Sequence, residues 1–146
     1  MAIHIHTLCY DNQMKTIAFR LKPGADLKTS IEQVVTEHGV KAGFIVTCVG
    51  GLEQACVRMA GATPDSQDIR TMEGDFEIVS LVGTVSVNGT HLHMSFSNKE
   101  GRVQGGHLKE GTVIHPTAEI VLGIDESATF TREMDGETGF TELVVK

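Results

Sequence analysis

The order of hydrophobic and polar positions predicts one helix near the start of the chain. Apolar side chains recur there with the spacing of a single helix face, at Leu27, Ile31, Val34 and Val35. Asp26 stands where an N-cap residue is favoured, and Gly39 stands where a helix commonly ends. The pattern therefore predicts a helix from Asp26 to about His38.

Most of the remaining chain has the alternation or the short apolar runs that are typical of strands. The predicted strands are residues 3–10, 14–21, 44–60 with a bend at Gly50-Gly51, 76–87, 91–97, 102–108, 117–124, 130–134 and 140–145. Residues 61–68 and 111–117 are predicted to be connections. No repeat, linker or low-complexity segment divides the sequence. We therefore expect one domain over residues 1–146, of α+β class with mainly antiparallel strands.

Residues 91–97 carry two histidines on one face of a predicted strand. His91 and His93 share their parity with two serines, whereas Leu92, Met94 and Phe96 occupy the alternate positions. Such alternation is typical of a half-buried strand with its apolar side chains inward. We therefore expect the two imidazoles to lie side by side on the outer face.

A third histidine, His107, belongs to the next predicted strand. A three-residue loop of Lys99, Glu100 and Gly101 would place His107 directly opposite His93. A loop two residues longer would place it opposite His91, and a four-residue loop would turn it to the other face. With either odd loop length, His91, His93 and His107 form a candidate metal site, and zinc is the first candidate, at one ion per chain.

The alternative for any His-X-His pair is a polar strand face without a metal. That interpretation is favoured for His4 and His6, and it would also be favoured for His91 and His93 alone. The addition of His107 at a compatible register favours a metal site over a polar strand face, because three histidines have the ligand type and number of a zinc site.

Charge and cysteine content narrow the classes of function. The 146 residues include 12 lysines and arginines against 19 acidic residues, a net charge of -7, and no basic run. This disfavours direct nucleic-acid binding, which depends on a basic surface. Three cysteines without CxxC spacing, no charged-then-apolar leader and no membrane-length apolar run predict a cytoplasmic protein with reduced thiols.

Three motifs resemble those of a known family. Three stretches are similar to motifs of the plants-and-prokaryotes-conserved (PPC) domain: Gly-Asp-Phe-Glu-Ile-Val-Ser-Leu-Val-Gly at 74–83, His-Leu-His-Met-Ser at 91–95 and Gly-Gly-His-Leu at 105–108. The resemblance covers nearly the whole chain and implies a curved antiparallel sheet packed around one helix, assembled as a homotrimer. It also brings a DNA-binding label. In the plant members that bind DNA, a separate AT-hook of Arg-Gly-Arg-Pro type makes the contact, and this sequence has none, so no DNA-binding residue is predicted.

A more distant resemblance is to acetolactate decarboxylase and related zinc proteins. In those proteins a His-X-His pair and a third histidine downstream hold a zinc ion, and His91, His93 and His107 match that order and approximate spacing. The remainder of that active site has no residue-by-residue match here. The resemblance therefore implies a zinc centre but not the same reaction.

Three histidines leave a zinc ion with an open fourth position, which permits either catalysis or capture of a small anionic ligand. The candidate helpers are Glu53, Glu77, Glu119 and Arg102, for each of which an exposed face or a fixed ion pair is the alternative. We single out Glu77, within the Phe-Glu-Ile motif, and Arg102, which opens the strand of His107, as candidate catalytic residues.

Two functions follow as hypotheses: a homotrimeric binding or regulatory module, or a zinc-dependent lyase or hydrolase acting on a small carbonyl, ester or carboxylate compound. The ligand, the physiological metal and any DNA-binding partner stay open, as does whether the site lies within one subunit or between two.

Overall fold

Strands dominate the part of the chain that the computed structural model describes, residues 14–146. The elements are β1 (Lys15–Leu21), α1 (Leu27–Glu37), β2 (Ala42–Arg58), β3 (Ile69–Ser86), β4 (Gly89–Ser97), β5 (Val103–Leu108), β6 (Val113–Ile124), β7 (Phe130–Met134) and β8 (Thr141–Val145). The predicted strand 3–10, with His4, His6 and Cys9, lies outside the described residues. Within the described range, no helix is both long and apolar enough to traverse a membrane.

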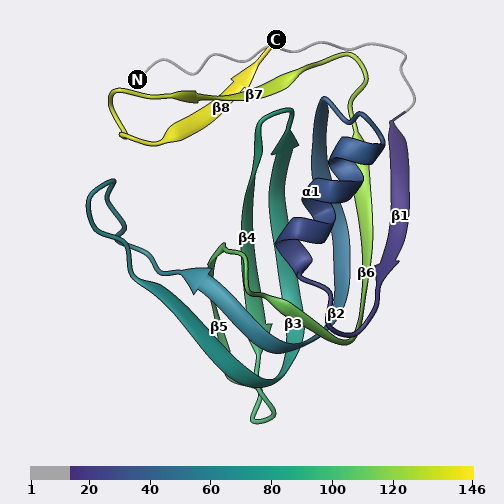
Figure 1. The fold of residues 1–146 in the computed structure, drawn as a ribbon, viewed down its shortest axis with the longest axis vertical. Coiled ribbons are helices and arrows are strands. Elements are labelled where there is room, and N and C mark those ends of the chain that lie inside the picture. Colours follow the sequence, from purple (N-terminus) through teal and green to yellow (C-terminus); the bar gives the residue numbers. More distant parts are fainter. Residues whose placement is uncertain (1–13) are drawn as a thin grey trace.

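Six strands form one antiparallel sheet in the order β1-β6-β2-β3-β4-β5 (Figure 1). The end of β2 also pairs with β5, through Val57–Leu108 and Arg58–His107. Because β2 therefore contacts both β3 and β5, the four strands β2, β3, β4 and β5 close into a ring. The predicted class, a curved and mainly antiparallel sheet with one main helix, is confirmed.

A change of register in β2 accompanies this curvature. The pairing between β2 and β6 shifts between Gly50 and Leu52, at the predicted bend. Gly50 has a φ of 154°, and a Cβ atom there would overlap the carbonyl oxygen of Thr117. A side chain at this position would therefore force β6 away from β2.

Helix α1 covers one face of the sheet, over β2 and β6 (Figure 1). Its buried face consists of Leu27, Ile31 and Val35, as the sequence predicts. The Asp26 carboxylate caps the helix by accepting a hydrogen bond from the Thr29 amide at 2.9 Å, and the chain leaves the helix through Gly39 at a φ of 60°. Burial of this face joins α1 to the same core that holds the inner faces of the strands.

Asp26 has a second structural role that the sequence does not show. Its Oδ2 atom accepts hydrogen bonds from the backbone amides of Gly111 and Thr112, at 2.6 and 3.1 Å. One carboxylate thus fixes both the start of α1 and the connection between β5 and β6.

Substitution of Asp26 by alanine should therefore destabilise the protein. The change removes a helix cap and two charge-assisted hydrogen bonds, so we expect the free energy of unfolding to fall by about 2 to 3 kcal/mol in urea denaturation. Asp65→Ala, in the exposed loop after β2, is the matched control and should change stability by less than about 0.5 kcal/mol. Equal effects of the two substitutions would contradict the double role of Asp26.

Two predicted boundaries are wrong, and long-range pairing explains both. Residues 111–117 are not simply a connection, because β6 begins at Val113 and the fully buried Ile114 pairs with Leu52. Strand β3 begins at Ile69 rather than at residue 76, since its first residues pair with the end of β2. In both cases a neighbouring strand extends the ladder beyond the segment with a clear local pattern.

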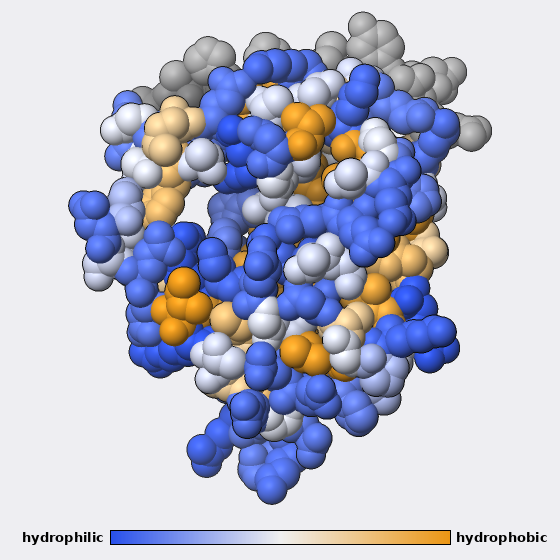
Figure 2. Space-filling model, viewed as in Figure 1, coloured by the Kyte–Doolittle hydropathy of each residue, from blue (hydrophilic) through white to orange (hydrophobic). Residues whose placement is uncertain are grey.

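The last two strands form a separate hairpin, as predicted, which lies across one end of the main sheet (Figure 1). It is attached by a hydrogen bond from the Val87 amide to the Phe130 carbonyl, 3.1 Å, and by two bonds between Asn88 and the Arg132 backbone, 2.8 and 2.9 Å. The space-filling view shows a mostly hydrophilic surface that is hollowed below this hairpin (Figure 2).

Candidate metal centre

The three predicted histidines meet on the β4–β5 hairpin. His91 and His93 lie on β4, and His107 on β5 is the direct partner of His93. Asn98 closes the turn by donating to the Arg102 carbonyl at 3.1 Å, and Gly101 has the left-handed φ of 75°. The predicted three-residue loop and its register are thus confirmed.

Burial of the opposite face fixes the direction in which these imidazoles point. Leu92, Met94 and Phe96 are at most 2% exposed, so the alternate positions of β4 must face outward. Glycine lets β5 approach the strands on both sides: a Cβ atom on Gly105 would overlap the Met94 carbonyl oxygen, and one on Gly106 would overlap that of Arg58. The Gly-Gly-His sequence thus places His107 between β4 and β2.

The distances between the imidazoles suit a tetrahedral metal ion. One ligand nitrogen from each of the three rings lies within 4.8 Å of the others, and the Nε2 atoms of His91 and His93 are 3.2 Å apart. Zinc–nitrogen bonds of about 2.05 Å at the tetrahedral angle place two donors about 3.3 Å apart. The pair on β4 already has this spacing, and a His107 nitrogen lies within 4.8 Å of a nitrogen of each of the other two rings. The residues therefore fit a zinc ion.

Burial and nearby arginines keep the imidazoles of His91 and His107 in the form that binds a metal. Burial, followed by the positive charge of Arg58, lowers the pKa of His107 to about 3. Burial, followed by the charge of Arg132, also lowers the pKa of His91. Both rings are neutral near pH 7 and offer a lone pair without having to release a proton.

The lowered pKa of His107 predicts how the stability of metal-free protein depends on pH. Unfolded histidine titrates near 6.5, so below this pH the unfolded chain binds a proton that the folded chain refuses until pH is about 3. This contribution to stability is complete above pH 6.5 and is lost as pH falls towards 3. In thermal melts, wild type should lose more stability between pH 7 and pH 4.5 than His107→Gln does. Equal losses would show that His107 makes no such contribution.

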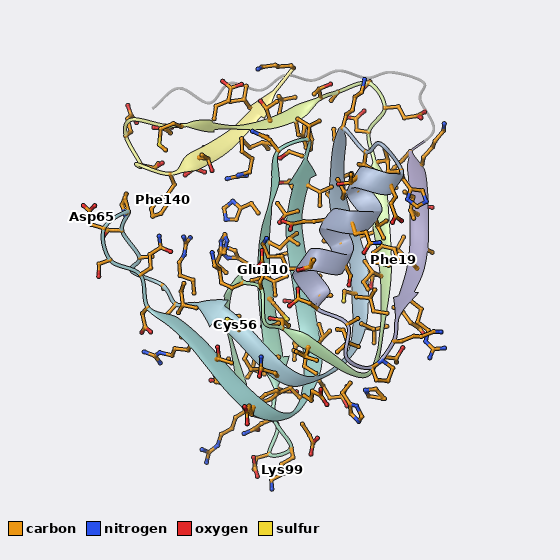
Figure 3. The ribbon with its side chains drawn as sticks, viewed as in Figure 1. Phe19, Cys56, Asp65, Lys99, Glu110 and Phe140 are labelled. Atoms are coloured by element: carbon orange, nitrogen blue, oxygen red, sulfur yellow. The ribbon has the colours of Figure 1, made fainter. Side chains whose placement is uncertain are left out.

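Charged side chains surround the histidines on the side of the C-terminal hairpin. A hollow of about 310 Å³ beside His91 and His107 is lined by Lys28, Glu32, Arg58, Arg132, Phe140 and Glu142, among others. Phe140 projects into the space between hairpin and sheet in Figure 3. A second hollow, of about 330 Å³, borders His91 and His93. Two hollows that share His91, Arg132 and Glu142 therefore border the histidines.

Arg132 is held firmly beside the first histidine. Its guanidinium donates to the Thr141 carbonyl oxygen, lies 3.6 Å from a Glu142 carboxylate oxygen and approaches His91 Nδ1 to 3.4 Å. Local sequence patterns do not predict a role for Arg132, Glu142 or Phe140, because nothing local indicates that the last hairpin packs beside the histidines. For Arg58, the alternation along its strand indicates only that the side chain faces outward. That it lies beside His107 depends on the long-range pairing of β2 with β5.

The predicted helper residues lie elsewhere. Glu77 pairs with Ser97, four residues along β4 from His93 and so about 13 Å away, and Arg102 pairs with Asn98 at the hairpin turn. Glu53 lies 3.7 Å from His115, and Glu119 pairs with Arg20 and Val49. The structure brings His91, His93 and His107 together, but not these four residues with them.

Comparison with known proteins identifies the family. Residues 9–124 match the family model of the Plants and Prokaryotes Conserved (PCC) domain, also abbreviated PPC, so the chain belongs to this family. Over 133 residues it is also 37% identical to two proteins from Synechococcus named bifunctional protein GlmU. The match covers 91% of this chain but only about a fifth of the length of those relatives.

Solved structures share the fold. A hypothetical protein from Salmonella is 30% identical, with a TM-score of 0.87 over 94% of this chain and 96% of the other. A metal-containing protein from Archaeoglobus fulgidus is 24% identical, with a TM-score of 0.80 over 94% and 99% of the two chains. At such identity the second likeness shows the fold alone.

A more distant likeness agrees with the second resemblance found in the sequence. A Staphylococcus aureus protein described as similar to α-acetolactate decarboxylase has a TM-score of 0.51 and 18% identity, over 75% of this chain and 52% of the other. The family's DNA-binding label is also present among the neighbours. A "Putative DNA-binding protein" from Ralstonia eutropha has a TM-score of 0.79 and 15% identity, over 88% and 90% of the chains.

Proposed function

We propose that this protein is a homotrimeric, zinc-binding member of the PPC family that works as a binding or regulatory module, with a small anionic ligand at its metal. The observation that supports this most is the meeting of three imidazole nitrogens within 4.8 Å on one rigid hairpin. The description of the Archaeoglobus relative as a metal-containing protein also supports a metal. The match to one part of much longer bifunctional proteins is in keeping with a module.

A zinc ion held by His91, His93 and His107 would supply one open position with Lewis-acid character. The chain itself supplies the binding geometry. The β4–β5 register fixes the spacing of His93 and His107, and the two hollows that border the histidines leave space for a small ligand. Nearby cationic side chains favour a ligand of negative charge.

A patch of valines supports the homotrimer. Val46, Val49, Val79 and Val82 are each about half exposed, at 48 to 57%. The pairs Phe44–Thr84 and Gly51–Glu77 set one common register, which places Val46 beside Val82 and Val49 beside Val79. Apolar side chains gathered on an exposed sheet face are typical of a protein interface. Because Val82 pairs with His93, we place the interface next to the metal centre.

We do not propose direct DNA binding. The net charge of -7 opposes contact with a phosphate backbone, so any DNA contact would belong to a partner protein. The cytoplasm is the proposed compartment, in keeping with the buried free thiols of Cys48 and Cys56. A mobility shift with this protein alone that weakens steeply with salt would overturn this part of the proposal.

A zinc-dependent lyase or hydrolase of small carbonyl, ester or carboxylate compounds is the second candidate. The open access to the centre and the fold likeness to an α-acetolactate decarboxylase relative favour it. In that case His91→Ala should abolish turnover and leave the trimer folded. Glu77 and Arg102 could act as catalytic residues in such an enzyme only if a conformational change brought them to the substrate, because both lie apart from the histidines.

Two measurements on one sample test the main proposal. Tag-free protein, purified without chelator, is subjected to elemental analysis and to light scattering after size exclusion. We expect about one zinc ion per chain and a mass three times that of the 15.7 kDa chain. A metal-free protein that takes up no zinc on incubation would refute the metal site, and a monomeric mass would refute the assembly.

A further inference from the structure

Arg58 is a cation without an acidic partner in the hollow beside the histidines. Of the other cationic side chains there, Lys28 contacts Glu32 at 2.7 Å and Arg132 contacts Glu142 at 3.6 Å. Among residues 14–146, no carboxylate forms an ion pair with Arg58. A half-buried guanidinium in such a setting lacks the charge-assisted hydrogen bonds that usually compensate for its loss of water.

The existing contacts of Arg58 orient its guanidinium without satisfying its donors. Its Cζ atom lies 5.1 Å from the centre of the Phe140 ring, so the plane is supported by a cation–π contact. Nη1 is 3.5 Å from the Gln67 side-chain oxygen, and Nη2 is 3.5 Å from His107 Nδ1. Both distances are at the long limit of hydrogen bonding.

Metal binding through His107 Nε2 would remove one of these two acceptors. A neutral imidazole that gives Nε2 to a metal carries its hydrogen on Nδ1. Arg58 would then find no acceptor on His107, and the N–H groups that face the hollow would be left for a ligand. A planar guanidinium presents two parallel N–H groups, and the two oxygens of a carboxylate can each accept a hydrogen bond from one of them.

We propose that Arg58 is the carboxylate-binding residue of a ligand site that it shares with the three-histidine centre, which rests on the proposed zinc-dependent function. The ligand class is a small carboxylate that carries a second oxygen donor for the metal. Phe140 positions Arg58 from the C-terminal hairpin, and Arg132 is occupied by Thr141 and Glu142. Specificity for the charged group would therefore depend on β2 and the hairpin rather than on the metal ligands.

The test uses the full chain loaded with cobalt(II), whose visible absorption bands change when a ligand enters its coordination sphere. Glycolate and its neutral amide, glycolamide, are titrated separately into wild type, Arg58→Gln and Arg70→Gln. Arg70 is exposed, paired with Asp68 and absent from the lining of both hollows, so its substitution removes the same charge without removing a lining residue. Arg58→Lys serves as a second variant in case the glutamine variant fails to fold. It keeps the positive charge but lacks the two parallel N–H groups of the guanidinium.

We expect wild type and Arg70→Gln to bind glycolate about 10- to 100-fold more tightly than glycolamide. Arg58→Gln should lose most of this preference while it retains the same cobalt content, and Arg58→Lys should retain only part of it. Cobalt uptake with equal binding of the two probes, or with neither bound, would overturn the carboxylate site and leave the metal proposal intact. A preference that survives in Arg58→Gln would do the same. No cobalt uptake by wild type would overturn both.

Discussion

Replacement of His91 and His93 by alanine is expected to abolish zinc binding, from about one ion per chain to none detectable by elemental analysis. The double variant retains only His107 among the three donors, and a single imidazole cannot compete with buffer for the ion. The fold should persist, because both side chains lie on the outer face of β4 and the core contacts of Leu92 and Met94 are unchanged. Far-ultraviolet circular dichroism and the elution volume check this second expectation.

The matched control is a double substitution of two histidines outside the cluster. His38, at the end of α1, and His115, an exposed residue of β6, lie apart from the three ring nitrogens. His38→Ala/His115→Ala should keep the full metal content. If instead both double variants retain zinc equally, the ion binds somewhere other than the proposed centre.

Phe96→Ala should have the largest effect on stability of any substitution proposed for this protein. Phe96 is fully buried on the inner face of β4, and its ring meets that of Phe76 edge to face at 5.0 Å. Loss of this side chain leaves a cavity below the hairpin that carries the histidines. We expect the free energy of unfolding to fall by about 3 to 5 kcal/mol in urea denaturation.

Met134→Ala is the control for loss of an apolar side chain without a cavity. Met134, on β7, is 71% exposed, so its truncation should change the free energy of unfolding by no more than about 0.5 kcal/mol. A loss below about 1 kcal/mol in Phe96→Ala would mean that the core collapses around the missing ring, and that β4 is not held by this contact.

The sequence predicts well those features of the structure that depend on residues close together in the chain. The alternation of residues 91–97, the turn residue Gly101 and the cap Asp26 each specify structure within a few residues, and the hairpin register that brings His107 to His93 follows from them. The candidate metal ligands can therefore be predicted without knowledge of the fold. The place of Glu77 within the Phe-Glu-Ile motif carries no information on its distance from the histidines, so its separation from them could not be predicted.

What the sequence does not predict depends on contacts between distant segments. Arg58 reaches His107 only because the far end of β2 pairs with β5, across 49 positions of the chain. Arg132 reaches His91 because Asn88 holds the backbone of β7, 44 residues away. No periodicity encodes such pairings, since they are chosen by the packing of the whole sheet. The sequence therefore predicts the three histidines of the cluster but not the charged side chains around them.

His93 and His107 both lie where their strands are paired on two sides, because β4 pairs with β3 and β5 at His93 and β5 pairs with β4 and β2 at His107. A strand that is bonded on both sides cannot slide by a residue without breaking two ladders, so the imidazoles are pre-organised before any ion arrives. The conformational entropy of bringing the ligands together is then lost when the chain folds rather than when the metal binds. Unlike a zinc finger, which unfolds when its ion is removed, this site should empty and refill on an unchanged backbone.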